Sequence, residues 1–368
     1  MRICLLEPYD TGSHGAWLRG YAAHSRHEVQ CLTLDGRFWK WRMHGGAVTL
    51  ARHYREQGIH ADLLLASDML DLSTFRALTT DLTHDTPAVL YLHENQLTYP
   101  LRPDEHRDLH YGFINYVSML CAQRVYFNSR FHLESWFEEL PRLLKHFPDY
   151  NELPTVAQLR ARASVLPLGL DLLPLDAYHP VARRSGPATI LWNHRWEYDK
   201  NPGAFLAALG SLTERGYDFR VVFLGEVFVR IPPEFQAARE RLGERILQFG
   251  YVDARADYAR WMWRSDIVTS TAIHEYFGAA LVEALYCDCF PVLPGRLSYP
   301  QFIPPEMVDR CLYQTQEELV ERLSRAIQDI DMTRANSLKN IASEYDWALM
   351  APRYDDEFEQ VIKQQEVR

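Results

Sequence analysis

The sequence predicts an α/β protein with two doubly wound, Rossmann-like domains, and three observations support this prediction. The chain has 368 residues, about twice the length of a typical single domain. Short apolar strand patterns alternate with amphipathic helix patterns in both halves, as βαβ units require. A cluster of Pro, Arg, Ser and Gly at residues 178–188 separates the halves, and the alternation begins again after it.

The first half is expected to form one domain over residues 1–178. It opens with an apolar strand at 2–8, and a glycine-bearing turn then leads into a helix that ends at residue 24. Further strands are predicted at 28–34, 61–67, 88–95, 124–129 and 162–172, with a helix at 47–58. Several strands end in polar residues, which is typical of a parallel sheet with a ligand site at its carboxyl edge.

The second half is expected to form a domain over residues 188–345. The predicted elements are strands at 189–195 and 218–226, a helix at 203–216, helix–strand pairs at 238–252 and 255–272, and the apolar segment 274–295. An amphipathic helix over 346–368 is expected to pack back on the first domain.

Composition limits the classes of function. A formal net charge of −10 argues against indiscriminate nucleic-acid binding but leaves room for a local basic site. No apolar run reaches the roughly 18 to 20 residues that span a bilayer, and the apolar start is too short for a signal peptide. The six cysteines lack framework spacing. Cys287 and Cys289 suggest one buried and one half-buried thiol, in a reduced, cytosolic protein without a zinc site.

Two cations in the second half suit a diphosphate. Arg195 and Lys200 lie in the loop after a predicted strand, five residues apart. Arginine offers a fork of hydrogen-bond donors and lysine a compact charge, and both suit phosphate oxygens. A solvated loop with two surface cations is the alternative.

Two carboxylates in segment 274–295 call for partners. A spacing of eight residues predicts that Glu275 and Glu283 lie near one face of a helix. Glu275 could simply complement the helix dipole, while the backbone amides of residues 277–279 (Phe277, Gly278 and Ala279) would face an anion. Glu283 lies among apolar residues, where a carboxylate needs hydrogen-bond donors, and a ribose diol supplies two.

These residues resemble the retaining nucleotide-sugar glycosyltransferases of family four. The resemblance rests on Glu-x₇-Glu, the Phe-Gly pair, the trailing FPVLP and the earlier Arg-x₄-Lys. It implies a GT-B fold, in which two Rossmann-like domains face a central cleft. It also implies that Glu275 contacts the transferred sugar, Glu283 the ribose, and Arg195 and Lys200 the diphosphate. Gly225, His274 and Tyr276 would join this donor site, although Tyr276 replaces a glycine that is usual in the family.

Nearly the whole chain resembles the tRNA-queuosine α-mannosyltransferases. The motifs EPYDTGSHGAWL, FWKWRMH and HENQLTYP carry this resemblance in the first half. It implies transfer of mannose from GDP-mannose to the cyclopentenediol of queuosine in a tRNA anticodon. It further implies that the departing phosphate helps to deprotonate the acceptor hydroxyl, with no catalytic metal and no cofactor beyond the nucleotide sugar.

The first half is expected to complete the donor site. Gly12, Ser13 and His14 follow a strand and precede a helix, where backbone amides suit a phosphate. They are predicted to form the other wall of the diphosphate site. By the resemblance, His93 contacts the transferred sugar or the departing phosphate and is not a metal ligand. A histidine buried in the core is the alternative.

A basic and aromatic stretch is the candidate acceptor surface. Residues 37–42 interleave cations, which contact phosphates, with aromatic rings, which stack on unpaired bases. The predicted acceptor-binding residues are Trp39, Lys40, Trp41, Arg42, Asn95 and Gln96, and Arg102, Arg107 and Lys145 could extend the basic track. The alternative is an amphipathic strand with buried tryptophans and a solvated basic face.

Two other functions stay open at this point. One is a family-four transferase that acts on a lipid-linked or surface glycan. The other is a nucleotide-sugar or RNA-binding protein without catalysis. The joint presence of Arg195, Lys200, Glu275 and Glu283 favours an enzyme.

Overall fold

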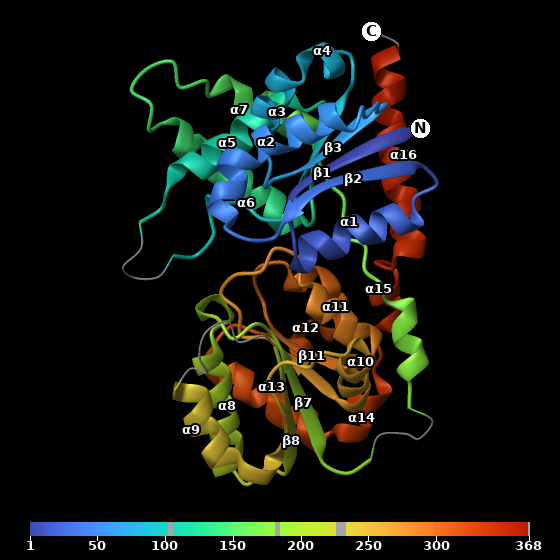
Figure 1. Ribbon diagram of the computed structural model, residues 1–368. Coiled ribbons are helices and arrows are strands. Elements are labelled where there is room, and N and C mark those ends of the chain that lie inside the picture. The colour runs from blue at the N-terminus through green and yellow to red at the C-terminus, as the bar shows by residue number, and fades with distance from the viewer. Residues whose placement is uncertain (102–105, 181–184, 226–232, 367–368) are drawn as a thin grey trace. The chain divides into compact units, whose positions relative to one another are not determined.

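The computed structural model describes residues 1–101, 106–180, 185–225 and 233–366 (Figure 1). The chain divides into two compact units: Met1–Leu170 with Trp347–Arg368 form unit 1, and Asp171–Asp346 form unit 2. Arg102, Glu226 and residues 181–184 of the expected linker lie outside the described residues.

Unit 1 is built on a six-stranded parallel sheet with the order β2-β1-β3-β4-β5-β6. Its strands are β1 (Arg2–Asp10), β2 (Glu28–Asp35), β3 (Leu63–Ser67), β4 (Ala88–Leu92), β5 (Arg124–Phe127) and β6 (Ala163–Val165). The strand order reverses between β1 and β3. Ligands of open α/β sheets bind beyond the carboxyl ends of the strands at such a switch point.

The helices of unit 1 cover both faces of this sheet. They are α1 (Gly12–His24), α2 (Trp39–Glu56), α3 (Leu72–Leu78), α4 (Thr80–Thr83), α5 (Leu109–Cys121), α6 (Arg130–Leu144), α7 (Pro154–Arg162) and α16 (Trp347–Glu366). Alternate strand residues such as Leu64 and Leu90 pack in one core with α2, α3, α5 and α6. On the opposite face, Tyr91 stacks on Trp17 of α1 and Tyr354 of α16. Burial on both faces explains why these strands are almost wholly apolar.

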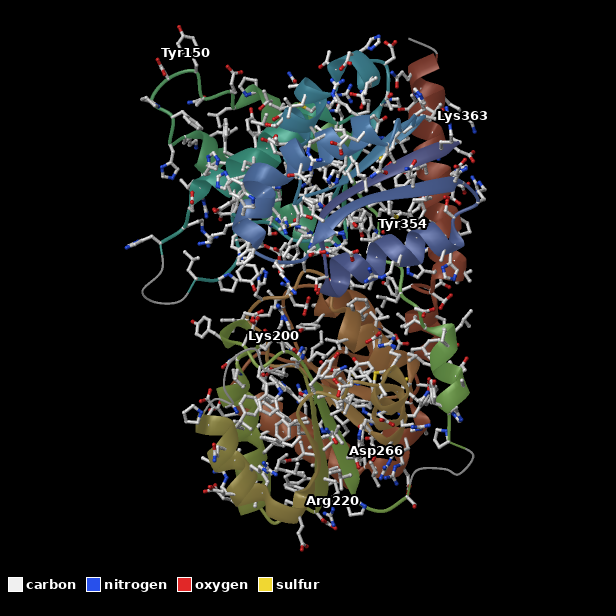
Figure 2. The ribbon with its side chains drawn as sticks, in the orientation of Figure 1. Tyr150, Lys200, Arg220, Asp266, Tyr354 and Lys363 are labelled. Carbon is white, nitrogen blue, oxygen red and sulfur yellow. The ribbon has the colours of Figure 1, made fainter. Side chains whose placement is uncertain are left out.

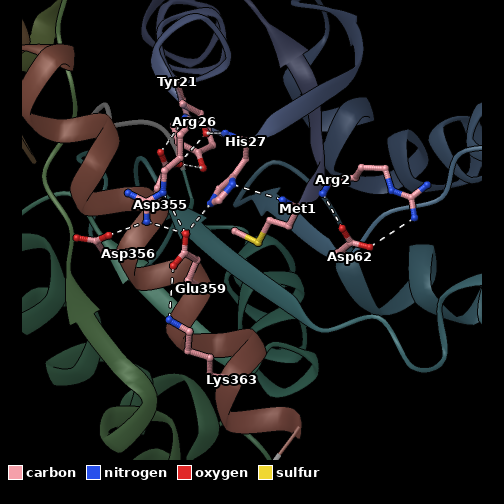
Figure 3. Close-up of polar contacts among 11 residues, drawn as sticks. Met1, Arg2, Tyr21, Arg26, His27, Asp62, Asp355, Asp356, Glu359 and Lys363 are labelled. Atoms are coloured by element: carbon pink, nitrogen blue, oxygen red, sulfur yellow. Dashed lines mark hydrogen bonds and ion pairs between the residues drawn. The ribbon is translucent and has the colours of Figure 1, made fainter.

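The last helix, α16, belongs to unit 1 and is held there by a buried carboxylate (Figures 1 and 3). Asp355 accepts hydrogen bonds from the Tyr21 hydroxyl at 2.8 Å, the Ser25 hydroxyl at 2.6 Å and the Arg26 backbone amide at 2.9 Å. Nearer the surface, the Arg26 guanidinium pairs with Asp356 and Glu359. The sequence separation of more than 300 residues makes this contact a purely tertiary feature.

Unit 2 contains a second six-stranded parallel sheet, with the order β12-β11-β10-β7-β8-β9. Its strands are β7 (Ala188–Asn193), β8 (Phe219–Leu224), β9 (Ile246–Phe249), β10 (Ile267–Thr269), β11 (Phe290–Pro294) and β12 (Leu312–Tyr313). Its α-helices are α8 (Pro202–Glu214), α9 (Pro233–Leu242), α10 (Arg255–Arg264), α11 (Ala279–Tyr286), α12 (Val308–Cys311), α13 (Gln316–Gln328), α14 (Ile330–Ala335) and α15 (Lys339–Ser343). In order of sequence, the strands follow the Rossmann arrangement 3-2-1-4-5-6, whose switch point lies between β7 and β10.

The boundary between the units precedes the Pro- and Gly-bearing cluster. Residues 171–178, which were expected in the first domain, belong to unit 2. Local polar contacts account for this: the Trp263 indole donates to the Leu175 carbonyl oxygen at 2.8 Å, and the Tyr286 hydroxyl donates to Asp176 at 2.8 Å. Composition signals a flexible linker, but such side-chain contacts cannot be read from it.

The structure also bears on the predictions for the cysteines and for membrane-spanning segments. Cys287 and Cys289 are both buried, so the prediction of one half-buried thiol is wrong; the turn after α11 brings both side chains into the core of unit 2. Among the described residues, none of the helices has the length and apolar character needed to cross a membrane.

Candidate functional site

An ion pair joins two loops at the carboxyl edge of the unit 2 sheet. Lys200, labelled in Figure 2, follows β7, and its Nζ atom lies 3.3 Å from Oε2 of Glu275 and 3.0 Å from Oδ2 of Asp199. Nζ also donates to the His274 carbonyl oxygen at 3.0 Å. Burial opposes the charged form of Lys200, but the charges of Glu275 and Asp199 outweigh it, and the pKa of Lys200 lies above its ordinary value.

Glu275 is kept ionised by its neighbours. Burial alone would raise the pKa of Glu275, but its neighbours, above all the charge of Lys200, lower that pKa below its usual range. A fixed carboxylate beside a fixed ammonium can hold a polar ligand without rearrangement. The structure thus brings together two residues that the sequence places 75 positions apart.

His194 belongs to this cluster and was missed by the sequence analysis, which selected only its neighbour Arg195. Burial, and then the charge of Lys200, lowers the pKa of His194 to about 4. Its Nε2 atom is buried without a hydrogen-bond partner among the described residues. The position of His194 directly after a buried strand could have indicated it, because site residues of parallel sheets lie there.

Gly225 brings two loops of the site close together. A Cβ atom at Gly225 would lie 1.8 Å from the His194 carbonyl oxygen, so no other residue fits there. The role of Gly225 in donor binding stays a prediction. What the structure shows is a close approach between the ends of β7 and β8.

The segment before α11 differs from the expected continuous helix. Helix α11 begins at Ala279, and its N-cap residue Gly278 has a φ of +99°, which glycine adopts without strain. Glu275 therefore lies in the preceding loop, and only Glu283 is on the helix, so the prediction of two carboxylates on one helix face is wrong. Glycine at the N-cap breaks the helix that the apolar pattern suggested.

The side chains of Tyr276 and Phe277 are buried, so a donor could meet only their backbone. Tyr276 packs edge-on against the His274 ring, with the ring centroids 4.3 Å apart. Phe277 packs against Phe302 and Tyr345 in the core of unit 2. These contacts orient the loop that carries Glu275.

Glu283 has protein partners in this structure. One carboxylate oxygen accepts from Arg255 at 2.5 Å and the other from the Tyr258 hydroxyl at 2.9 Å. These donors provide the hydrogen bonds that a carboxylate on an apolar helix requires. A ribose diol would therefore have to share Glu283 with Arg255 and Tyr258.

Arg195 lies at the surface near this cluster. Its side chain is 48% exposed and forms an ion pair with Glu197 at 3.4 Å. Its charge opposes protonation of Lys200, so the two cations lie within electrostatic reach of each other. Arg195 is thus far more exposed than Lys200, whose side chain is 9% exposed.

In unit 1, the predicted site residues His14 and His93 form a buried cluster with Glu7 near the switch point. Nδ1 of His14, in α1, lies 2.9 Å from Oε2 of Glu7, in β1, and both residues are buried. The His14 and His93 rings lie 4.2 Å apart. Burial disfavours the imidazolium form of His14, but the charge of Glu7 and its hydrogen bond raise the pKa of His14 to about 9. Burial and the charge of His14 hold the pKa of His93 well below its usual range.

Glu7 is a second residue that the sequence analysis missed. In the described residues, Glu7, His14 and His93 each offer a ligand atom within 4.8 Å of the others, a spacing that would admit a metal ion. Glu7 already accepts hydrogen bonds from His14 and from the Tyr9 amide, however, and the two imidazole rings lie side by side. We therefore interpret the cluster as a proton-bound pair beside a neutral histidine. Gly12 and Ser13 lie exposed at the start of α1 beside it.

The predicted acceptor residues differ in exposure. The stretch around residues 38–42 begins helix α2, so the alternative of an amphipathic strand is wrong. Trp41 is 64% exposed, whereas Trp39 packs against Tyr111 with the ring centroids 5.1 Å apart. Lys40 is exposed, and Arg42 donates to the Asp35 carbonyl oxygen at 3.0 Å.

The HENQ loop is held by its own side chains. Asn95 is fully buried, and its amide oxygen accepts from the backbone amides of Leu97 and Thr98. We therefore assign Asn95 a role in shaping the loop instead of contacting an acceptor. Gln96 is half-buried, and Arg107 donates to its carbonyl oxygen at 2.6 Å, so Arg107 also serves the loop. Lys145 is exposed at the end of α6.

Comparison with known proteins adds two family matches. Residues 2–170 match the model of the tRNA-queuosine alpha-mannosyltransferase N-terminal domain, and residues 178–344 match that of glycosyl transferases group 1. The chain is 34% identical over 333 residues to a tRNA-queuosine alpha-mannosyltransferase of Drosophila melanogaster, covering 87% of this chain and 85% of the relative. It is also 22% identical over 259 residues to a GDP-mannose:cellobiosyl-diphosphopolyprenol alpha-mannosyltransferase of Xanthomonas oryzae, covering 69% and 67% of the two chains.

Solved structures share the fold at low identity. Anabaena HepE in complex with UDP superposes with a TM-score of 0.70 at 17% identity, over 98% of this chain and all of the other. The catalytic domain of starch synthase IV from Arabidopsis thaliana gives a TM-score of 0.73 at 12% identity over the whole of both chains. These likenesses confirm the α/β GT-B fold that the sequence predicted.

Proposed function

Because the chain belongs to the tRNA-queuosine α-mannosyltransferase family and is therefore a glycosyltransferase, we propose that it transfers mannose from GDP-mannose to the queuosine of a tRNA anticodon with retention of configuration. The observation that carries this proposal is the ion pair between Lys200 and Glu275, at the carboxyl edge of the unit 2 sheet, where nucleotides bind in Rossmann-like domains.

The donor is proposed to bind unit 2 through its charges and helix amides. Arg195 and Lys200 contact the diphosphate, and the start of α11 at Gly278 offers backbone amides to the same group. Negative charge builds on the diphosphate as the glycosidic bond breaks, and fixed cations stabilise it. Glu275 contacts the sugar, and Glu283 contacts the ribose while it keeps Tyr258 as a partner.

Unit 1 is proposed to act on the sugar and its acceptor. The buried His14 and His93 offer one charged and one neutral imidazole. Among the described residues, Nε2 of His93 has no hydrogen-bond partner, and it can bond to a sugar hydroxyl or a phosphate oxygen. The RNA acceptor would meet the exposed start of α2. The protein would then act in the cytosol.

The direct test is incubation of the protein with queuosine-containing tRNA and labelled GDP-mannose. We expect label on the RNA, and none on the same tRNA that carries guanosine in place of queuosine. Transfer from UDP-glucose instead of GDP-mannose would contradict the donor, and label on a polyprenol-linked glycan instead of RNA would contradict the acceptor. Donor binding without transfer to any acceptor would favour a non-catalytic protein.

A parallel reaction with EDTA examines the proposal that no metal takes part. We expect the rate to be unchanged, because fixed cations neutralise the diphosphate. Loss of activity that a divalent cation restores would instead point to a metal bound by the donor or by Glu7, His14 and His93.

A further inference from the structure

Two large aromatic side chains at the start of α2 are turned to solvent. Phe38 is 78% exposed and Trp41 is 64% exposed. Trp39, which lies between them in the sequence, instead packs with Tyr9 against a small core that includes Met43 and Tyr111. Contiguous exposed apolar surface commonly marks a binding site, and Phe38 and Trp41 lie three residues apart at the start of one helix.

The Trp41 ring lies against a glycine one turn later in α2. A Cβ atom at Gly45 would lie 2.8 Å from Cζ2 and 2.9 Å from Cε2 of Trp41. The indole ring therefore rests against the bare backbone of Gly45, while most of its surface stays in solvent. A glycine inside a helix costs about 1 kcal/mol relative to alanine. The missing side chain leaves room for the ring to lie in this position.

The surroundings of Trp41 carry positive charge in an otherwise acidic protein. Arg37 and Lys40 are exposed and adjoin Phe38 and Trp41 in the sequence, within a chain of net charge −10, and Nζ of Lys40 lies 5.6 Å from the centroid of the Trp39 ring. Asp35 is the exposed acid nearest in sequence, and Arg42 is bonded to its carbonyl oxygen. Aromatic faces between exposed cations suit single-stranded nucleic acid, whose bases stack on the rings while its phosphates meet the cations.

We propose that Trp41, oriented by Gly45 and flanked by Phe38, is a stacking platform for an unpaired base of the RNA acceptor. This inference rests on the proposed function, which supplies an anticodon loop as the acceptor. A base that stacks on Trp41 covers exposed aromatic surface of the ring, which favours binding. Lys40 and Arg37 then contact the phosphates on either side of that base.

The experiment compares the Kd for queuosine-containing tRNA among variants at one ionic strength. Trp41→Ala is expected to raise the Kd about tenfold or more, the loss of one stacked base. Trp41→Phe should retain most of the affinity because it keeps an aromatic face. Tyr150→Ala removes a side chain that is 89% exposed elsewhere in unit 1 (Figure 2) and should leave the Kd unchanged.

Gly45→Ala provides the sharper variant, since it removes neither an aromatic ring nor a charge. Alanine favours the helix, so the midpoint of thermal unfolding should not fall. The new methyl group, however, displaces the Trp41 ring. We expect a Kd raised by several-fold. In the double variant with Trp41→Ala, Gly45→Ala should add nothing, because it acts only through Trp41.

The measurements distinguish a failure of the stacking platform from a failure of the proposed function. A wild-type protein that modifies tRNA, with Trp41→Ala and Gly45→Ala variants that bind it as tightly as Tyr150→Ala does, overturns the platform and leaves the proposed function intact. A wild-type protein that neither binds nor modifies tRNA removes the proposed function, and the platform with it.

Discussion

Nζ of Lys200 lies 3.3 Å from Oε2 of Glu275, and this pair connects the loop after β7 with the loop before α11. Both residues were predicted to act on the donor, one on the diphosphate and one on the sugar. Their contact means that the charge of each one sets the electrostatic environment of the other. Removing either member should therefore have effects beyond the loss of its own ligand contact.

Lys200→Met is expected to reduce both stability and activity. It leaves Glu275 and Asp199 without their buried cation, and breaking a buried pair in this way costs about 3 to 5 kcal/mol of unfolding free energy. Arg195→Met is the matched variant, because Arg195 is half exposed and its loss should change stability by less than about 0.5 kcal/mol. Chemical denaturation and transfer assays compare the two. Equal stability of the two variants would contradict the buried role of Lys200.

Glu275→Gln is expected to lower kcat while GDP binding stays measurable. The amide keeps the shape of the side chain but removes the negative charge at the proposed position of the sugar, and such groups typically contribute about 100-fold or more to the rate. Calorimetry with GDP and a transfer assay at saturating donor give the two readouts. An unchanged kcat would exclude Glu275 from the chemistry.

His194 is expected to make the fold sensitive to acid. The pKa of His194 is about 4 in the folded state and 6.5 for the free side chain. Between these two values, His194 is therefore protonated in the unfolded chain and neutral in the folded protein. Stability from this group is thus full above pH 6.5 and falls as the pH drops towards 4, by up to about 3 kcal/mol. His194→Gln should lose less stability over the same range. The free energy of unfolding of the two proteins, measured across this pH range, tests the prediction. An equal loss of stability in both proteins would contradict it.

Asp355→Ala is expected to destabilise unit 1 strongly. The carboxylate is 1% exposed and accepts three hydrogen bonds, from Tyr21, Ser25 and Arg26, which would be left unsatisfied in the variant (Figure 3). Each buried unsatisfied group costs about 1 to 3 kcal/mol. Asp356→Ala, one residue further on, removes a mostly exposed carboxylate and should cost less than about 1 kcal/mol. Similar unfolding midpoints for the two variants would show that α16 is held by its apolar contacts alone.

The predicted elements that the structure reproduces are those with strong local patterns. The strands around Leu64 and Leu90 are continuous apolar runs, and helix α8 carries apolar residues at helical spacing, so each was found from sequence. The start of α11 was not, because the apolar pattern continues through Gly278 although the helix does not. The left-handed conformation of Gly278 keeps the preceding residues out of the helix, and the periodicity of apolar residues does not report backbone angles.

The sequence by itself determined the α/β class, the tandem arrangement and the motifs that mark a glycosyltransferase, because these depend on residue type and local spacing. Only the tertiary structure decided which charged residues form ion pairs. Glu7 lies beside His14 and Lys200 beside Glu275, and Glu283 is bonded to Arg255. It also decided that Trp41 faces solvent while Trp39 is packed. Pairing and exposure arise when distant segments fold against one another, and a protonation state follows from the neighbours that folding supplies.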